Sequence, residues 1–131
     1  MDITFRLFIL WLHLLAALIW VGGLVFQLLI VDAAFGRATS IRERVRLGLL
    51  LEGRFRYVLW PAVGVVLLTG LYNVMNVLYT TTLAGGSIPP AFARTLTIKL
   101  ILIALMIVVQ SLHQFALRPK RIALLLSLIH I

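Results

Sequence analysis

Cysteine is absent from this chain, and acidic residues are scarce. Its 131 residues include 12 lysines and arginines but only 4 aspartates and glutamates. Without cysteine there are no disulfides, thiolate metal sites or thiol redox chemistry. Phosphate-binding loops, dinucleotide fingerprints and HExxH metalloprotease motifs are also missing. The sequence therefore shows no recognisable catalytic motif of these kinds.

Charge is missing from three long stretches, which lie at 7–31, 57–93 and 100–117. A helix needs about 20 mostly apolar residues to cross the hydrocarbon core of a bilayer, and 63% of this chain is hydrophobic. The sequence therefore predicts an all-α, polytopic transmembrane helix bundle with three full spans, as one unit over residues 1–125. The expected helices cover about 5–31, 57–79 and 97–117. No acidic residue falls inside them, so a carboxylate proton relay is not supported.

The last residues form a second apolar run that begins at Ile122 and is too short to span a bilayer. The six residues 126–131 resemble the in-frame translation of a sequencing-library adapter. We expect a fourth helix from residue 122 that is truncated, with 126–131 foreign to the natural protein. The alternative is a short interfacial end.

Basic residues gather in two of the connections, and this asymmetry predicts the topology. They are Arg37, Arg42, Arg44, Arg46, Arg54 and Arg56 in the first, and Arg118, Lys120 and Arg121 in the last. Lysine and arginine mark cytoplasmic loops, whereas the connection at 80–92 has neither and carries glycines and prolines typical of a turn. We therefore expect the N-terminus outside. The arginine-rich segment 41–56 also has apolar residues at helical spacing, which fits an amphipathic surface helix or an early start of the second span.

Each expected span carries one stripe of polar residues, and depth sorts these residues into two clusters. An ionisable residue inside a bilayer is a functional hypothesis by default. His13, Asn73, Asn76 and Lys99 are expected near the outer ends of their helices. Gln27, Gln110, His113 and Gln114 are expected near the inner ends, with Arg54 or Arg56.

Histidine nitrogen ligates copper, zinc or haem iron, so His13 and His113 are the candidate metal ligands. Their depths differ by roughly 10–15 Å at the helical rise, which argues against one haem held by both. Alternative roles are structural: His13 bonding a neighbouring helix, Lys99 snorkelling to the headgroups and Asn73 binding helices together.

The string from His13 to Phe26, HLLAALIWVGGLVF, resembles the first-helix signature of the bacterial copper-resistance D (CopD) membrane family. The basic start Arg54-Phe55-Arg56 and the later Thr69-Gly70-Leu71-Tyr72-Asn73 are similar to that family's second helix, and the segment around Lys99 to its third-helix entry. This resemblance implies a multi-pass protein of the bacterial inner membrane that is involved in copper uptake or tolerance.

A weaker resemblance is to the HemJ-type protoporphyrinogen oxidases, through His13 and Lys99. It implies a b-type haem redox protein in which His13 is an axial ligand and Lys99 and Asn73 complete the cofactor site. The cofactor is therefore copper or haem b, and enzymatic activity is open. A third hypothesis is a non-catalytic membrane subunit. The expected partners are the lipid bilayer and a metal ion or haem, with a homo-oligomer or a redox partner open and no nucleic acid.

Overall fold

The described part of the chain is helical throughout its ordered elements. The structure is a computed structural model that describes residues 2–31, 33, 37, 40–116, 123, 126 and 127. Helix α1 (Ile3–Phe26) continues into a π-helical turn, η1 (Gln27–Val31). Helix α3 (Ile41–Leu83) is followed by α4 (Pro90–Ser111), which ends in a second π-helical turn, η2 (Leu112–Ala116). Strands are absent from these residues.

Three helices of the described chain are long and apolar enough to cross a membrane. The candidate spans are Ile3–Ile30, Arg46–Leu83 and Pro90–Phe115, with mean hydropathies of 2.3, 1.7 and 2.2. The all-helical class and the three spans predicted from the charge-free stretches are thereby confirmed. The expected fourth helix and residues 126–131 fall almost entirely outside the described residues.

Helix α3 contains both the second span and the arginine-rich segment before it. The side chain of Ser40 accepts a hydrogen bond from the Glu43 backbone N–H at 3.3 Å, which caps the helix at its first turn. Two interpretations of residues 41–56 were open, and the structure agrees with the early start of the second helix. At the usual rise this helix of 43 residues is about 65 Å long. Its length exceeds the hydrocarbon core of about 30 Å, so one end of α3 must lie outside it.

The third span starts earlier than the sequence pattern indicated. Pro90 occupies the first turn of α4, where a missing N–H costs nothing and the fixed φ suits the helix. The sequence analysis assigned Pro90 to the turn. The turn itself is built on Gly85, whose φ of 67° is a conformation that glycine adopts without strain.

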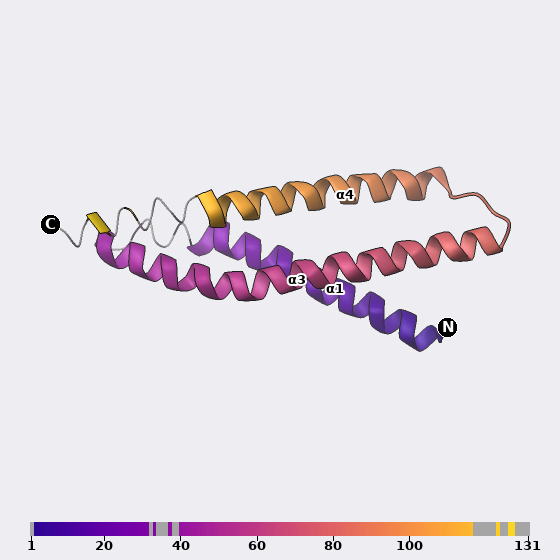
Figure 1. Cartoon of the computed structure of the whole chain (residues 1–131), viewed down its shortest axis with the longest axis horizontal. Helices are drawn as coiled ribbons and strands as arrows, with labels where there is room; N and C mark the ends of the chain where they lie inside the picture. The colour runs from indigo at the N-terminus through magenta and orange to yellow at the C-terminus, as the bar shows by residue number, and fades with distance from the viewer. Residues whose placement is uncertain are drawn as a thin grey trace.

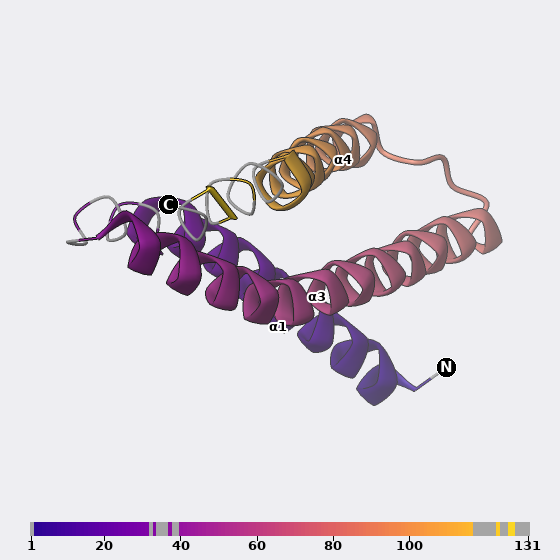
Figure 2. The same cartoon turned by 60° about the vertical axis from the view of Figure 1, so that its left-hand side comes forward.

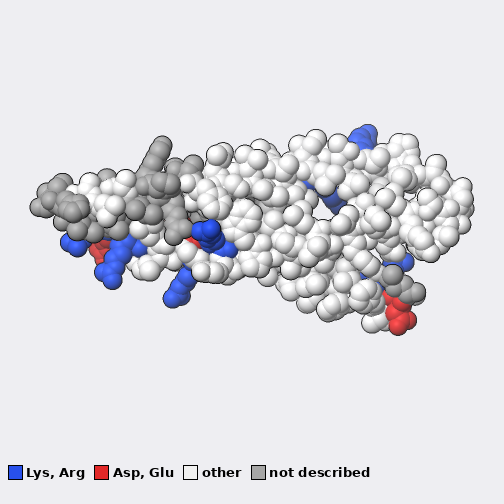
Figure 3. Space-filling model, viewed as in Figure 1, with Lys and Arg blue, Asp and Glu red and all other residues white. Residues whose placement is uncertain are grey.

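The helices run in alternating directions, so the bundle has two distinct ends (Figure 1). The arginine end holds η1, the start of α3 and η2, and the turn end holds the start of α1 and the 84–89 connection. Figure 2 shows α1 crossing α3 while its first turns lie apart. Charged residues in Figure 3 sit mainly towards the two ends, and the middle of the face is largely uncharged, as a membrane span requires.

The apolar core lies where α1 crosses α3. It consists of buried Ala16, Trp20, Leu59, Ala62, Val63 and Val66. Small residues allow the two backbones to approach. A Cβ built on Gly23 would lie 2.5 Å from Leu59 Cδ2, so any larger residue there would have to displace the Leu59 side chain. Helix α4 joins this core through Ile103, Met106 and Ile107, while most of 90–105 is exposed.

Candidate metal site and polar ladder

His13 is held against α3 by one hydrogen bond, which its Nδ1 shares with Thr69. Its Nδ1 lies 2.8 Å from Thr69 Oγ1, and the Thr69 hydroxyl donates to the carbonyl of Val65 at 2.5 Å. When that hydroxyl donates to Val65, its oxygen can accept only a hydrogen carried by His13 Nδ1. The other ring nitrogen, Nε2, then keeps its lone pair. A neutral imidazole in this tautomer can ligate a metal ion.

Gly70 makes room for this imidazole. A Cβ built on Gly70 would lie 3.2 Å from His13 Cε1, closer than ordinary van der Waals contact. Thr69 and Gly70 therefore act together, the first by accepting a hydrogen bond and the second by allowing the ring to approach. Thr69 was part of the string that resembles the family's second helix, but it was not among the predicted site residues. Its partnership with His13 joins residues 56 positions apart, which helical spacing alone does not reveal.

The other residues predicted for the outer cluster lie apart from this contact. Asn73 is half-buried on α3, one turn beyond Thr69, and Lys99 is exposed on α4. Asn76, with its amide oxygen turned to Arg6, accepts hydrogen bonds from Nε at 2.8 Å and Nη2 at 3.2 Å. Within the described residues, no hydrogen bond or ion pair connects Lys99 to His13. The structure brings His13 to Thr69 and Arg6 to Asn76, but it does not gather the four predicted groups.

A second polar group crosses the bundle towards its arginine end, and we call it the polar ladder. It consists of three hydrogen-bonded pairs: Trp20 Nε1 donates to Gln110 Oε1 at 2.6 Å, Gln27 Nε2 lies 3.2 Å from His113 Nδ1, and Trp60 Nε1 donates to Gln114 Oε1 at 2.6 Å. All three glutamines and His113 are buried. Gln27, Gln110, His113 and Gln114 were predicted at this level, whereas Trp20 and Trp60 were not among the predicted residues.

The ladder keeps polar atoms that its own pairs do not satisfy. A tryptophan N–H only donates, so the amides of Gln110 and Gln114 are fixed with oxygen towards the ring. Their Nε2 atoms, and Gln27 Oε1, have no hydrogen-bond partner among the described residues. Buried polar atoms of this kind usually bind water or a polar ligand.

Two π-helical turns contain half of the ladder. Gln27 opens η1, and η2 contains His113 and Gln114. π-Turns are rare, and they occur frequently at functional sites because the extra residue re-aims neighbouring side chains. The periodicity of the sequence did not indicate them, since one inserted residue barely changes the apolar pattern.

The two histidines belong to separate levels of the bundle. Gln27, the partner of His113, lies 14 positions beyond His13 on one continuous helical segment, about 21 Å at the usual rise. A single metal ion or haem cannot reach both rings. The described residues also contain no group of three or more histidine, cysteine, aspartate or glutamate side chains that could hold a metal. Among the described residues, neither histidine therefore belongs to a cluster of three or more such candidate metal ligands.

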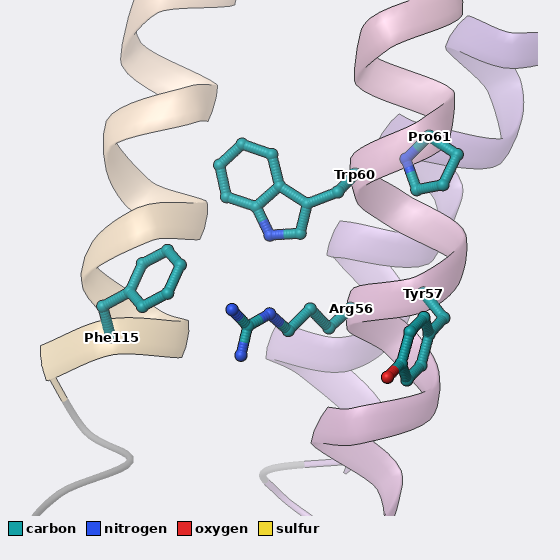
Figure 4. A pocket seen from close by; sticks show the side chains of 5 residues that line it. All are labelled: Arg56, Tyr57, Trp60, Pro61 and Phe115. Atoms are coloured by element: carbon teal, nitrogen blue, oxygen red, sulfur yellow. The ribbon is translucent and has the colours of Figure 1, made fainter.

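An open pocket of about 430 Å³ lies between α3 and α4 at the arginine end. It is lined by Arg56, Tyr57, Trp60, Pro61 and Phe115 (Figure 4). The Arg56 guanidinium lies 5.1 Å from the centre of the Phe115 ring, a cation–π distance. Of the two arginines expected near the inner polar residues, Arg56 thus reaches α4. His13 does not line this pocket.

Comparisons with known proteins agree with the helical pattern. A family model described as "Copper resistance protein D" (CopD) matches residues 49–123, more than half of the chain. The matched range contains Thr69, Gly70, Asn73 and Lys99 and both α4 glutamines, and it starts after α1, so His13 lies outside it. Nothing in the comparisons supports the resemblance to HemJ. No curated protein and no solved structure matched. The chain is a member of the CopD family and, with its three long apolar helices, a membrane protein related to copper resistance.

Proposed function

We propose that this protein takes part in copper uptake or tolerance at the bacterial inner membrane, and that His13 Nε2 is a ligand for the copper ion as it passes. The observation that carries the proposal is the hydrogen bond from His13 Nδ1 to Thr69. Metal-binding histidines commonly donate their second ring N–H to a fixed acceptor, which orients the ring and raises its basicity. Membership of the CopD family supports copper as the ion.

The chemistry of the described residues favours transient handling over storage. One imidazole provides a single borderline ligand, whereas tight Cu(I) sites use several soft sulfur ligands. The chain has no cysteine and three methionines. His113, about 21 Å further along, would serve as a second and separate station. With the N-terminus outside, the ion would meet His13 first and His113 near the cytoplasmic side.

The haem alternative needs a flat cavity beside His13. The pocket between α3 and α4 is lined by other residues, and the Cε1 edge of His13 already faces Gly70. Haem b held by His13, with Lys99 and Asn73 as further cofactor-binding residues, is the alternative to copper. A purely structural subunit remains the third hypothesis, and the experiment below separates the three.

The test is copper binding and cellular copper content for the full chain and its His13→Ala variant. The purified protein in detergent is loaded with copper, and bound metal is measured by elemental analysis alongside the visible spectrum. We expect bound copper in the wild type, a loss of at least about tenfold in affinity without His13, and no Soret band. His113→Ala should leave binding at His13 intact.

Cells that overproduce the protein distinguish uptake from tolerance. Uptake raises copper content and copper sensitivity, and tolerance lowers sensitivity. A Soret band lost in His13→Ala would overturn the proposal in favour of haem. Equal copper content in all variants would leave only the structural subunit.

A further inference from the structure

The pocket between α3 and α4 combines a cation with aromatic walls at one particular depth. Figure 4 shows the Arg56 side chain reaching across towards Phe115, with Trp60 above it. The ring nitrogen of Trp60 is already bonded to Gln114, so Trp60 presents its apolar surface to the pocket. Arg56 is exposed, and stacking on Phe115 leaves its N–H groups able to donate.

The depth of this pocket follows from the charge pattern. Arg56 is the last charged residue before the long uncharged stretch of α3, which begins at Tyr57. Phe115 belongs to η2, and in the sequence it lies three residues before Arg118, where the third charge-free stretch ends. The pocket thus lies on both helices where hydrocarbon gives way to headgroups. Tyrosine and tryptophan are enriched at this boundary, and Tyr57 is 83% exposed there.

We propose that this pocket binds one anionic phospholipid, with its phosphate on the Arg56 guanidinium and its glycerol and upper acyl chain against Trp60 and Phe115. Arginine recognises phosphate oxygens through paired N–H groups. Basic pockets between membrane helices select anionic headgroups. The charge complementarity is strong because the chain carries a net charge of +8. This proposal is independent of the copper proposal, since it involves neither histidine.

The test compares lipid selectivity of the full chain with that of two single-charge variants. Protein is reconstituted in vesicles of phosphatidylcholine containing brominated phosphatidylglycerol, and in matched vesicles containing brominated phosphatidylcholine instead. Bromine on the acyl chain quenches tryptophan. The Trp11→Phe background removes the exposed tryptophan and leaves Trp20, which is 1% exposed, and Trp60 as the reporter. The measured quantity is the preference for phosphatidylglycerol over phosphatidylcholine at Trp60.

Arg56→Gln should lower this preference about fivefold, the factor equivalent to about 1 kcal/mol per basic residue at an anionic surface. Arg54→Gln is the matched control, because Arg54 is exposed on the same helix, two residues away, and does not line the pocket. It removes the same charge and should leave the preference near that of the wild type. Excess inorganic phosphate should not compete.

Three results would overturn the proposal. An equal drop in both variants would mean general surface attraction, and no drop in Arg56→Gln would mean that the pocket does not select lipid. Competition by inorganic phosphate would mean a site for free anions. Circular dichroism of both variants checks that helix content is preserved, and Phe115→Leu, which keeps every charge, should reproduce part of the Arg56→Gln loss.

Discussion

At the scale of single residues, the hydrogen-bond acceptor of His13 decides what its ring can do. The Thr69 hydroxyl gives its proton to the Val65 carbonyl and so receives one from His13. A free imidazole would distribute its proton between both nitrogens and rotate. If His13 binds copper as proposed, Thr69 is a positioning residue, which orients the ring without touching the metal.

Replacing Thr69 by valine tests this role with little change in shape. We expect Thr69→Val to weaken copper binding by about 10- to 100-fold, the usual effect of losing the acceptor behind a metal-binding histidine. Thr69→Ser keeps the hydroxyl and should retain most of the affinity. Copper titration gives the affinities, and ¹⁵N NMR of the His13 ring gives the tautomer. A valine variant with an unchanged tautomer ratio would contradict the assignment.

At this scale, the sequence correctly predicted those groupings of polar residues that depend only on helical spacing. The seven-residue steps from His13 to Gln27 and the α4 run from Gln110 to Gln114 placed the inner polar residues at one level, and the structure joins them across helices. It did not bring Lys99 to His13, because the first half of α4 lies largely exposed. Residue depth follows from the sequence, but the lateral distance between helices depends on their packing.

At the scale of helices, α1 and α3 make a close contact at one glycine, Gly23. Gly23 meets Leu59, which is fully buried and has little freedom to move. The neighbouring Gly22 has open space where a Cβ would be. The two glycines are adjacent in sequence and have the same helix propensity, so they form a matched pair.

Gly23→Ala should destabilise the bundle by about 1–3 kcal/mol, because an added methyl group overpacks a close contact. Gly22→Ala should be neutral or slightly stabilising, since alanine favours a helix by up to about 1 kcal/mol over glycine. Unfolding in mixed detergent with increasing SDS, followed by circular dichroism, measures both. Equal stabilities of the two variants would show that the crossing is looser than the structure indicates.

Helix boundaries were harder to predict than helix identity, for two local reasons. Prolines at 89 and 90 indicate a turn, yet proline also suits a first helical turn, and α4 uses it so. The arginines at 42–56 suggested a separate surface element, but the Ser40 cap and good helix formers allow α3 to begin early. Charged residues show where the membrane-embedded part of a helix ends. The helix itself can continue beyond that point.

At the scale of the whole molecule, the distribution of arginine predicts which way the bundle faces. The arginine end should be cytoplasmic and the turn end external. Because the chain has no cysteine, single cysteines can be introduced without background. Arg37→Cys and Ser87→Cys place a thiol at exposed positions of the two ends.

In intact cells whose outer membrane has been permeabilised, a membrane-impermeant maleimide should label the Ser87→Cys variant to near completion and the Arg37→Cys variant at background level. Disruption of the inner membrane should expose both thiols. The reverse pattern would place the N-terminus inside, and the order in which copper meets His13 and His113 would then be exchanged.

The unbroken course of α3 links the membrane surface to the metal ligand mechanically. Thr69 lies 13 residues beyond Arg56 on the same helix, about 20 Å by the usual rise. A rotation or tilt imposed on the arginine-bearing turns, by lipid or by a docked protein, therefore turns the Thr69 hydroxyl relative to α1. Pro61, which lacks an N–H for the Tyr57 carbonyl, lies between them. If His13 binds copper as proposed, copper affinity would then respond to what happens at the lipid headgroups.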